Sequence, residues 1–313
     1  MSWVLVALLA YFLLAIANLF DKFLVDNVLP SGKAYAFAAC LLGGLLVLGA
    51  PWFLEWPGFY WFVINLLTGA VFAVALWLLY EAFRRGDASQ TAVLVGGLTP
   101  IFSIFFSIVF FKEQYSSQEW IGIITLLVGI FIIALLPQKR HIFSRILSKL
   151  GIKQKTRKGF FLFALGSALA YAIYFVATKY AYSAQPFASV FIWNRLGATL
   201  LVLTFLIKRR DRKQMLAVFK KSNKRKGKRK YLVLLSQALG SGGFLLQSYA
   251  IFLGSVALVN ALQGVQYAFL LIISTILAAI KPKLLKETFS ARIFTQKLVA
   301  VIVIGFGLYF IMI

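Results

Sequence analysis

The chain has 313 residues and a net charge of +24, and 61% of its residues are hydrophobic. Only 13% are charged, whereas soluble domains carry about a quarter of charged residues. Its one cysteine, Cys40, excludes an intramolecular disulfide, and its one histidine, His141, leaves histidine-based zinc or triad chemistry without its parts. This composition predicts a protein whose solvent is a lipid bilayer, and we expect no metal and no other cofactor.

Apolar stretches near the length that crosses a bilayer, about 20 residues, follow one another along the chain. There are ten, at residues 3–23, 33–50, 59–83, 89–111, 119–136, 159–182, 187–207, 230–253, 256–280 and 291–312. The first has no basic start and no A-x-A cleavage site, so we interpret it as a retained span. Short joints between several stretches predict antiparallel neighbours. The expected fold class is an all-α integral membrane protein with ten transmembrane helices.

Basic residues are concentrated in every second connection. The connections after the first, third, fifth, seventh and ninth stretches, with their flanking ends, hold 30 of the 33 lysines and arginines. Because basic loops stay in the cytoplasm, we expect a multi-pass protein of the plasma or inner membrane with both termini outside. The run 220–230 is then a topology signal with affinity for lipid headgroups rather than a nucleic-acid site. Segment 141–150 is expected to lie in the membrane interface as a short helix or to be a solvated linker.

The second half of the chain repeats the first. "YEAFRRG" at 80–86 corresponds to "SYAIFLG" at 248–254, and "CLLGGLLVL" at 40–48 corresponds to "RLGATLLVL" at 195–203. Because each half has five stretches, the second enters the membrane upside down, and such inverted repeats are typical of secondary transporters. The predicted domains are a first five-helix repeat, a basic cytoplasmic linker and a second five-helix repeat, at 1–137, 138–158 and 159–313.

Short motifs recur in order along both halves. They are Ala82, Gly86 and Pro100; Glu113, Gln118, Gly122 and Gly129; and Lys22, Lys179 and Arg195. With these motifs the chain resembles the drug/metabolite transporter superfamily in its ten-span form with two EamA-type domains. It departs from that pattern at Cys40, where the first half would have the arginine, and at Ala268, where the second half would have the proline. The resemblance implies a secondary carrier that moves a small metabolite, an amino acid or a drug-like compound by alternating access.

Two cations lie inside predicted spans. Arg195 is several residues from either end of its stretch, where a charge is costly unless it meets a partner or a ligand. We consider two hypotheses for it, an ion pair with Glu81 or Asp21, and a contact with the substrate. Lys179 is closer to a span end, so it either reaches the membrane interface or contributes to the substrate site.

Amides and aromatic residues complete the candidate substrate site. In the ninth stretch Asn260, Gln263 and Gln266 recur every three residues beside Tyr267, and such amides either join helices or line a polar path. The other candidates, from the third and eighth stretches, are Trp77, Tyr80, Glu81 and Gln247. For Glu81 we favour pairing with Arg84 and Arg85 one turn away, so proton coupling is not assigned.

Other residues are interpreted as architecture. Pro100 is expected to kink or loosen its helix and give a hinge. Glu113 and Glu287, each in a joint before a final span, are interpreted as helix-start signals. The remaining set, expected to let helices approach closely, is Gly122, Gly129, Gly305 and Gly307.

The leading functional hypothesis is a secondary carrier with a small-molecule substrate. A lipid or lipid-linked sugar flippase is an alternative within transport. A membrane scaffold and an intramembrane enzyme are further alternatives, although the chain has no P-loop, GxSxG motif or metal spacing, and we expect no enzyme. The expected partners are the substrate and the bilayer, not nucleic acid, and the fused halves favour a monomer or a weak homodimer.

Overall fold

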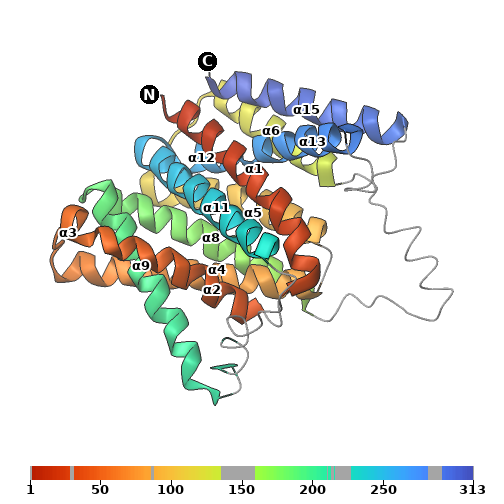
Figure 1. The fold of residues 1–313 in the computed structure, drawn as a ribbon. Helices are drawn as coiled ribbons and strands as arrows, with labels where there is room; N and C mark the ends of the chain where they lie inside the picture. The colour runs from red at the N-terminus through yellow and green to blue at the C-terminus, as the bar shows by residue number, and fades with distance from the viewer. Residues whose placement is uncertain are drawn as a thin grey trace.

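The computed structural model describes residues 2–28, 32–85, 88–134, 159–209, 211–212, 215, 227–280 and 291–312. Within these residues every regular element is a helix, as expected from the sequence (Figure 1). The elements are α1 (Trp3–Val28), α2 (Gly32–Gly44), a 3₁₀ turn η1 (Leu45–Gly49), α3 (Ala50–Phe53), α4 (Phe59–Arg85), α5 (Ala88–Phe111), α6 (Ser117–Ala134), α8 (Phe160–Tyr182), α9 (Phe187–Thr204), a 3₁₀ turn η2 (Phe205–Ile207), α11 (Gly227–Leu253), α12 (Val256–Ala261), α13 (Gln263–Ile280) and α15 (Ala291–Met312).

Each predicted stretch coincides with a helical segment, and two of them are less regular than expected. The second tightens at Leu45 into η1 and resumes as α3, where Pro51 near the start of α3 removes a backbone donor. The ninth is interrupted at Leu262, between α12 and α13. The predicted interfacial helix 141–150, Glu287, and the side chains of Asp21, Tyr267 and the basic run 220–230 lie outside what the structure describes.

Several of the helices are suited to a bilayer. Within the described residues, segments long and apolar enough to cross a membrane are 32–53, 59–85, 94–111, 160–182 and 187–207. Shorter apolar stretches lie in α1, α6, α11, α12–α13 and α15. These helices, together with their large exposed apolar side chains such as Leu67, Phe131 and Phe306, agree with a multi-pass membrane protein.

Neighbouring helices in space are often distant in sequence. Figure 1 shows α1 along α11 and α15 along α6, while α4 packs on both α8 and α9. The α4–α9 crossing brings two backbones together at Gly69 and Gly197. A methyl group on Gly197 would lie 2.3 Å from the carbonyl oxygen of Leu66, and one on Gly69 would lie 2.0 Å from that of Asn194. Only glycine permits this approach, which fixes α9 against α4.

The α6–α15 contact tests the predicted glycine positions. Gly122 and Gly307 face each other, since a methyl group on either would lie 3.0 Å from the other's carbonyl oxygen. A methyl on Gly129 would lie 2.4 Å from the Cγ1 of Ile304. Close packing at these three glycines is confirmed. The same prediction is wrong for Gly305 as far as the described residues show, since none of their heavy atoms lies within 4 Å of the added methyl.

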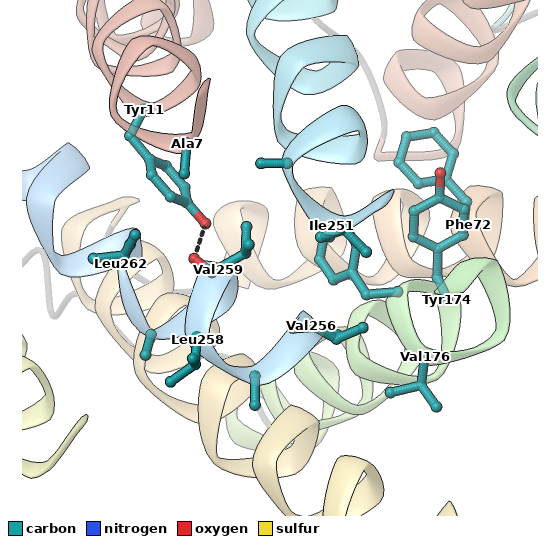
Figure 2. Close-up of a cluster of buried hydrophobic side chains, with 14 of the residues drawn as sticks. Ala7, Tyr11, Phe72, Tyr174, Val176, Ile251, Val256, Leu258, Val259 and Leu262 are labelled. Atoms are coloured by element: carbon teal, nitrogen blue, oxygen red, sulfur yellow. Dashed lines mark hydrogen bonds between the residues drawn. The ribbon is translucent and has the colours of Figure 1, made fainter. Parts of the chain in front are cut away.

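The buried core lies where α1, α4, α8, α11 and α12 meet. Figure 2 shows Phe72 of α4 beside Tyr174 of α8, with ring centroids 5.0 Å apart, and Ile251 of α11 near Val256 of α12. Tyr11 of α1 reaches across to α12. Large and small apolar side chains therefore interdigitate at the centre of the bundle, and the candidate site is built against this core.

Candidate functional site

Arg195 lies at the middle of α9, deep in the bundle. Helix α9 begins at Phe187, directly after Pro186, whose extended backbone separates it from the turn behind α8. Arg195 is 8% exposed, so its guanidinium is removed from bulk solvent at the level where an uncompensated charge is most costly. The sequence prediction that this arginine is buried away from span ends is confirmed.

Three phenylalanine rings contact the guanidinium. Its central carbon lies 4.6 Å from the ring centroid of Phe72 on α4, 4.6 Å from that of Phe244 on α11, and 4.8 Å from that of Phe191 one turn earlier on α9. We call Arg195 and these three residues the arginine box. Each desolvated cation–π contact stabilises the charge by about 2 kcal/mol. The rings offset part of the cost of burial, but they provide no lone pair for the N–H groups.

The guanidinium is left without a hydrogen-bond acceptor among the described residues. Its Nε is fully buried and has no partner there. Glu81, one proposed partner, instead pairs with Arg84 at 3.1 Å and Arg85 at 3.5 Å. The hypothesis of an Arg195–Glu81 pair is therefore wrong, because two arginines on the same helix face hold that carboxylate, and the predicted pairing of Glu81 with its neighbours is confirmed.

Helix α2 crosses α9 beside the arginine box. The hydroxyl of Thr199 donates to the carbonyl oxygens of Cys40, at 3.1 Å, and Arg195, at 2.8 Å. At Gly43 an added methyl would lie 3.5 Å from the Cδ and 3.6 Å from the Nη1 of Arg195. The absence of a side chain at Gly43 therefore leaves the space next to a terminal guanidinium nitrogen to other groups.

Further buried polar atoms lie on α4, α8, α9 and α11 and in the turn between α8 and α9. Ser248 lies one turn after Phe244 on α11, and Asn194 immediately precedes Arg195. Within the described residues the buried atoms without a well-formed hydrogen bond include Asn194 Oδ1, Ser248 Oγ, Tyr182 Oη, Gln185 Nε2, Asn65 Oδ1 and Trp77 Nε1, although Asn194 and Ser248 both lie close to the Tyr174 hydroxyl. Buried polar groups are nearly always paired, so these atoms are exceptions. They are spread along the bundle, since Asn65 and Trp77 are twelve residues apart on α4, which is about 18 Å along the helix axis.

Lys179, the second predicted cation, has a different environment. Its ammonium donates to the carbonyl oxygens of Ile251 at 2.9 Å, Phe252 at 3.1 Å and Gly254 at 2.7 Å. These are carbonyls at the C-terminal end of α11, which otherwise have no intrahelical donor, and a cation is favoured there by the helix dipole. Lys179 thus caps α11 rather than reaching the membrane interface. Its assignment to the substrate site remains a prediction.

The carboxylate of Glu113 lies next to this cap. It accepts hydrogen bonds from Ser255 at 2.6 Å and Tyr115 at 2.5 Å, and Ser255 is the N-cap of α12. Burial, and then the hydrogen bond to Glu113, raise the pKa of Tyr115. We call residues 251–255, held by Lys179 and Glu113, the α11–α12 joint.

Helix α6 begins with a different signal from the one expected. The amide of Ser116 donates to the carboxylate of Glu119 at 2.8 Å, and the amide of Glu119 donates to the Ser116 hydroxyl at 3.2 Å. This reciprocal pair is a capping box. The interpretation of Glu113 as the start signal of this helix is wrong, because Glu113 turns instead to the N-terminus of α12.

The predicted amides Gln247 and Asn260 join four helices. The Nε2 of Gln247 donates to Tyr11 Oη at 3.3 Å and to Asn260 Oδ1 at 3.4 Å, and Asn260 Nδ2 donates to Ser103 at 2.8 Å. Tyr11 in turn donates to the carbonyl of Val259 at 2.7 Å, the dashed line in Figure 2. Of the two roles left open by the sequence, these contacts favour the joining of helices. Gln263, the next candidate, is half-buried.

The remaining candidates lie towards the end of the bundle where α2 starts. Trp77 is contacted by the ammonium of Lys33, 5.0 Å from a ring centroid, and Lys33 also pairs with Asp211 at 2.9 Å. Tyr80 packs against Tyr35 in a tilted arrangement, with ring centroids 3.9 Å apart. Pro100 lies inside an α5 that continues without interruption to Phe111, so its role as a hinge stays a prediction.

Sequence reasoning missed two features of this region. The rings of Phe72 and Phe244 come from distant helices and carried no signal, whereas Phe191, one turn before Arg195, was visible in "FIWNR". The interruption at Leu262 was also missed, although broken helices at mid-depth commonly border transporter binding sites. No cluster of three or more His, Cys, Asp or Glu side chains that could hold a metal lies in the part of the chain that was searched.

Comparison with known proteins gives a family and a fold. The model of the EamA-like transporter family matches residues 1–135 and again residues 158–313. A solved structure described only as "Crystal structure of protein" superposes with a TM-score of 0.65 at 16% identity, covering 98% of this chain and 95% of that chain. It is one of 23 matching chains of solved structures. A search of curated proteins found no match.

Proposed function

This chain belongs to the EamA-like transporter family, and we propose that it is a secondary transporter that moves small organic solutes by alternating access. The proposal places it in the plasma or inner membrane with the basic loops in the cytoplasm. It works as a monomer or a weak homodimer, without a cofactor and without enzymatic activity of its own. The transporter class follows from the family, and the substrate site follows from the arginine box.

We propose ten spans arranged as two inverted five-helix halves. The two family matches fall one on each side of the basic linker. The packing is reciprocal, since the first helix of one half, α1, lies on α11, and its counterpart α8 lies on α4. In the alignment of 40–48 with 195–203, Gly44 corresponds to Thr199, and these residues touch, since a methyl on Gly44 would lie 2.5 Å from the Thr199 hydroxyl. Contact between equivalent positions is what a two-fold axis between the halves requires.

The observation that carries the function is the position of the arginine box. Phe72 belongs to the first half, whereas Arg195, Phe191 and Phe244 belong to the second, so the box spans the interface between halves. Inverted-repeat carriers bind substrate at such an interface near mid-depth. A buried charge whose donors end on no protein acceptor within the described residues favours a ligand over a structural role.

Alternating access also needs contacts that close each end. The Lys33–Asp211 pair joins the start of α2 to the segment behind η2, at the end that the basic loops assign to the cytoplasm. At the opposite end Glu113 of the first half and Lys179 of the second hold the α11–α12 joint. We propose that the Lys33–Asp211 pair opens and closes the cytoplasmic side during transport.

Counterflow in proteoliposomes tests the proposal. Purified protein is reconstituted, and uptake of amino acids, nucleosides, sugars, organic acids and cationic drugs is measured against the same solute inside. We expect saturable counterflow of at least one class that is lost in Arg195→Gln. A fluorescent-lipid translocation assay runs on the same vesicles. Lipid translocation without counterflow of any solute would replace the carrier with a flippase.

A further inference from the structure

We propose that the solute is an organic anion, bound by its carboxylate, phosphate or sulfonate group to the Arg195 guanidinium and by an apolar body to the surrounding rings. This inference deepens the proposed function and rests on it. Two observations predict a negative charge on the ligand. The arginine box presents a positive charge, and the described carboxylates lie elsewhere in the bundle.

The donors of Arg195 select an anionic group. A guanidinium has a fixed fork of N–H donors that matches the two oxygens of a carboxylate or phosphate. In the described residues it contacts rings, and the buried Nε has no acceptor. A ligand with two anionic oxygens supplies both the missing acceptors and the missing opposite charge, which a neutral ligand cannot do.

Every carboxylate whose side chain is described is placed elsewhere. Glu81 pairs with Arg84 and Arg85, and Asp211 pairs with Lys33. Glu113 holds Ser255, and Glu119 caps α6. Glu55, the fifth, is exposed in the connection before α4. None of these five forms an ion pair or a hydrogen bond with Arg195, so the protein offers its charge to a ligand.

Asp21 is the other partner that the sequence offered, and the backbone places it far from the box. On α11 the hydroxyl of Ser236 donates to the carbonyl of Ala17, one turn before Asp21 on α1. Phe244 lies eight residues further along α11, which is about 12 Å along the helix axis. Helices α1 and α11 run antiparallel, since Gly240 lies against Ala17 and Gly243 against Leu14. The backbone of Asp21 is therefore beyond the level of Ser236, on the side away from Phe244.

The surroundings of the guanidinium favour an apolar, preferably aromatic, body. Phe72 and Phe244 belong to a continuous group of rings, with neighbouring centroids 5.0 to 6.2 Å apart, that also includes Tyr171, Tyr174 and Phe175. Because no described carboxylate faces this group, an ammonium on the ligand would be desolvated without a counter-charge. Simple acids are therefore preferred to zwitterionic amino acids of the same size.

Gly43 provides the space for the anionic group. An added methyl would make only ordinary contacts, 3.5 to 3.6 Å from the Arg195 side chain, so alanine fits there without moving α2. It would nevertheless occupy the volume beside Nη1 from which an anionic oxygen approaches. Gly43→Ala is consequently a variant that weakens the ligand site while leaving the fold and the charge of Arg195 in place.

The test compares matched ligands on the whole protein. The probes share a phenyl ring, and all but the last also have a short alkyl chain: 3-phenylpropionate, its amide, phenylalanine, phenethylammonium and phenyl phosphate. Binding is measured by the rise in apparent melting temperature with ligand concentration, and transport by counterflow. We expect 3-phenylpropionate or phenyl phosphate to bind and to be exchanged, with the amide and phenethylammonium at least tenfold weaker and phenylalanine intermediate. This comparison needs no variant.

The variants locate the site. Arg195→Gln is expected to lose anion binding by about thirtyfold, as for the loss of a charge-assisted pair. Arg195→Lys, which keeps the charge without the fork, should retain part of it. Gly43→Ala should weaken binding severalfold, while Asp21→Asn and Arg209→Gln, an exposed arginine beyond the end of α9, should bind as the wild type does.

The outcomes separate the two proposals. Counterflow of a neutral or cationic solute while the anions do not bind leaves the carrier function intact and overturns the anionic class. Anion binding that survives in a folded Arg195→Gln protein also overturns the assignment to the arginine box. Anion binding without counterflow of any solute supports the ligand class and overturns the carrier function. Failure of every probe to bind or move, in protein that melts cooperatively, overturns both.

Discussion

Lys179 and Arg195 are two cations on consecutive helices of the same half, and their surroundings differ completely. The ammonium of Lys179 ends on three carbonyl oxygens of α11, whereas the guanidinium of Arg195 ends on three aromatic rings. A cation whose donors meet backbone acceptors stabilises the architecture. A cation that contacts aromatic rings and whose N–H donors meet no acceptor is held in place by the rings, and its donors remain available to a ligand. Within a membrane protein the pairing of the donors, rather than burial alone, separates structural from functional charge.

The strongest way to disturb this comparison is to displace α9 without touching either cation. In Gly197→Ala the new methyl would lie 2.3 Å from the carbonyl oxygen and 2.7 Å from the Cα of Leu66, both backbone atoms. Helix α9 must move away from α4, and Arg195 moves away from Phe72 with it. We expect the unfolding free energy to fall by about 3 kcal/mol, as for overpacking of a tight contact, and transport to be lost.

Gly305→Ala is the control for this prediction. Gly305 is also a glycine of an apolar helix, but no heavy atom of the described residues lies within 4 Å of its added methyl. Its melting temperature and counterflow should equal those of the wild type. If Gly197→Ala also behaved as the wild type in thermal melting, the close α4–α9 crossing would be refuted.

Exchange of each cation for glutamine sharpens the comparison directly. Lys179→Gln should lower the unfolding free energy by about 2 kcal/mol, because three carbonyls at the end of α11 lose a charged donor. Its affinity for the ligand should stay within about threefold, roughly 0.6 kcal/mol. Arg195→Gln should lose ligand affinity with little change in the unfolding free energy. Replacing a buried charge that lacks a partner costs little stability or even adds to it.

Thermal melting of the two variants measures the loss of stability expected for Lys179→Gln. Ligand titration of the same variants measures the loss of affinity expected for Arg195→Gln. A stability loss in Arg195→Gln as large as in Lys179→Gln would assign a structural role to both cations. A loss of ligand affinity in both would bring Lys179 into the substrate site, as the sequence had allowed.

The Lys33–Asp211 pair extends the comparison to an exposed cation. Its side chains are 28% and 17% exposed, so the attraction is partly screened by solvent. In a double-mutant cycle of Lys33→Gln and Asp211→Asn we expect a coupling free energy of about 0.5 kcal/mol in thermal stability. The same cycle measured by counterflow should show a larger coupling if the pair closes the cytoplasmic side. Equal coupling in both measurements would remove the pair from the transport cycle.

The smallest expected effect concerns pH at the α11–α12 joint. Burial and the hydrogen bond to Glu113 raise the pKa of Tyr115 above its ordinary value of 10. The folded protein therefore holds the phenol proton more tightly than the unfolded chain, so this contribution to stability is complete below pH 10 and is lost as the pH rises further. The melting temperature of the wild type should exceed that of Tyr115→Phe at pH 8, and this difference should be smaller at pH 11. A constant difference across this range would contradict the assignment.

The sequence predicted the helices better than their faces. Long apolar runs, separated by charged or proline-containing joints and by the short Gly254–Ser255 joint, located the described long helices, and the depth of Arg195 predicted its burial. Phe72 was beyond reach because α4 is apolar on nearly every side, so periodicity does not reveal which side faces inward. Phe244 was beyond reach because its contact with Arg195 joins two helices distant in sequence. The partners of Lys179 are backbone atoms of another helix end, which no side-chain pattern encodes.

The interruption of the ninth stretch shows a second limit. Proline is the expected cause of a broken helix, yet α5 runs through Pro100, while the break falls at Leu262 in a segment without proline. The break lies next to Asn260, which is tied to α5 and α11 by side-chain hydrogen bonds. These side-chain contacts between helices are not visible in the order of residues.

The contact between Gly44 and Thr199 has a consequence for ancestry. In a homodimer of two identical five-helix chains, a residue on the two-fold axis meets its own copy. A threonine at the position of Thr199 would then face a second threonine at the position of Gly44. There is no room for it, since even a methyl group on Gly44 would lie 2.5 Å from the Thr199 hydroxyl. Arginine would likewise face arginine across the axis, where Cys40 now stands within electrostatic reach of Arg195. If the two halves of the proposed inverted repeat arose by duplication and fusion, the fusion released both positions from self-complementarity. Divergence could then leave a single positive charge where symmetry would have imposed two that repel each other.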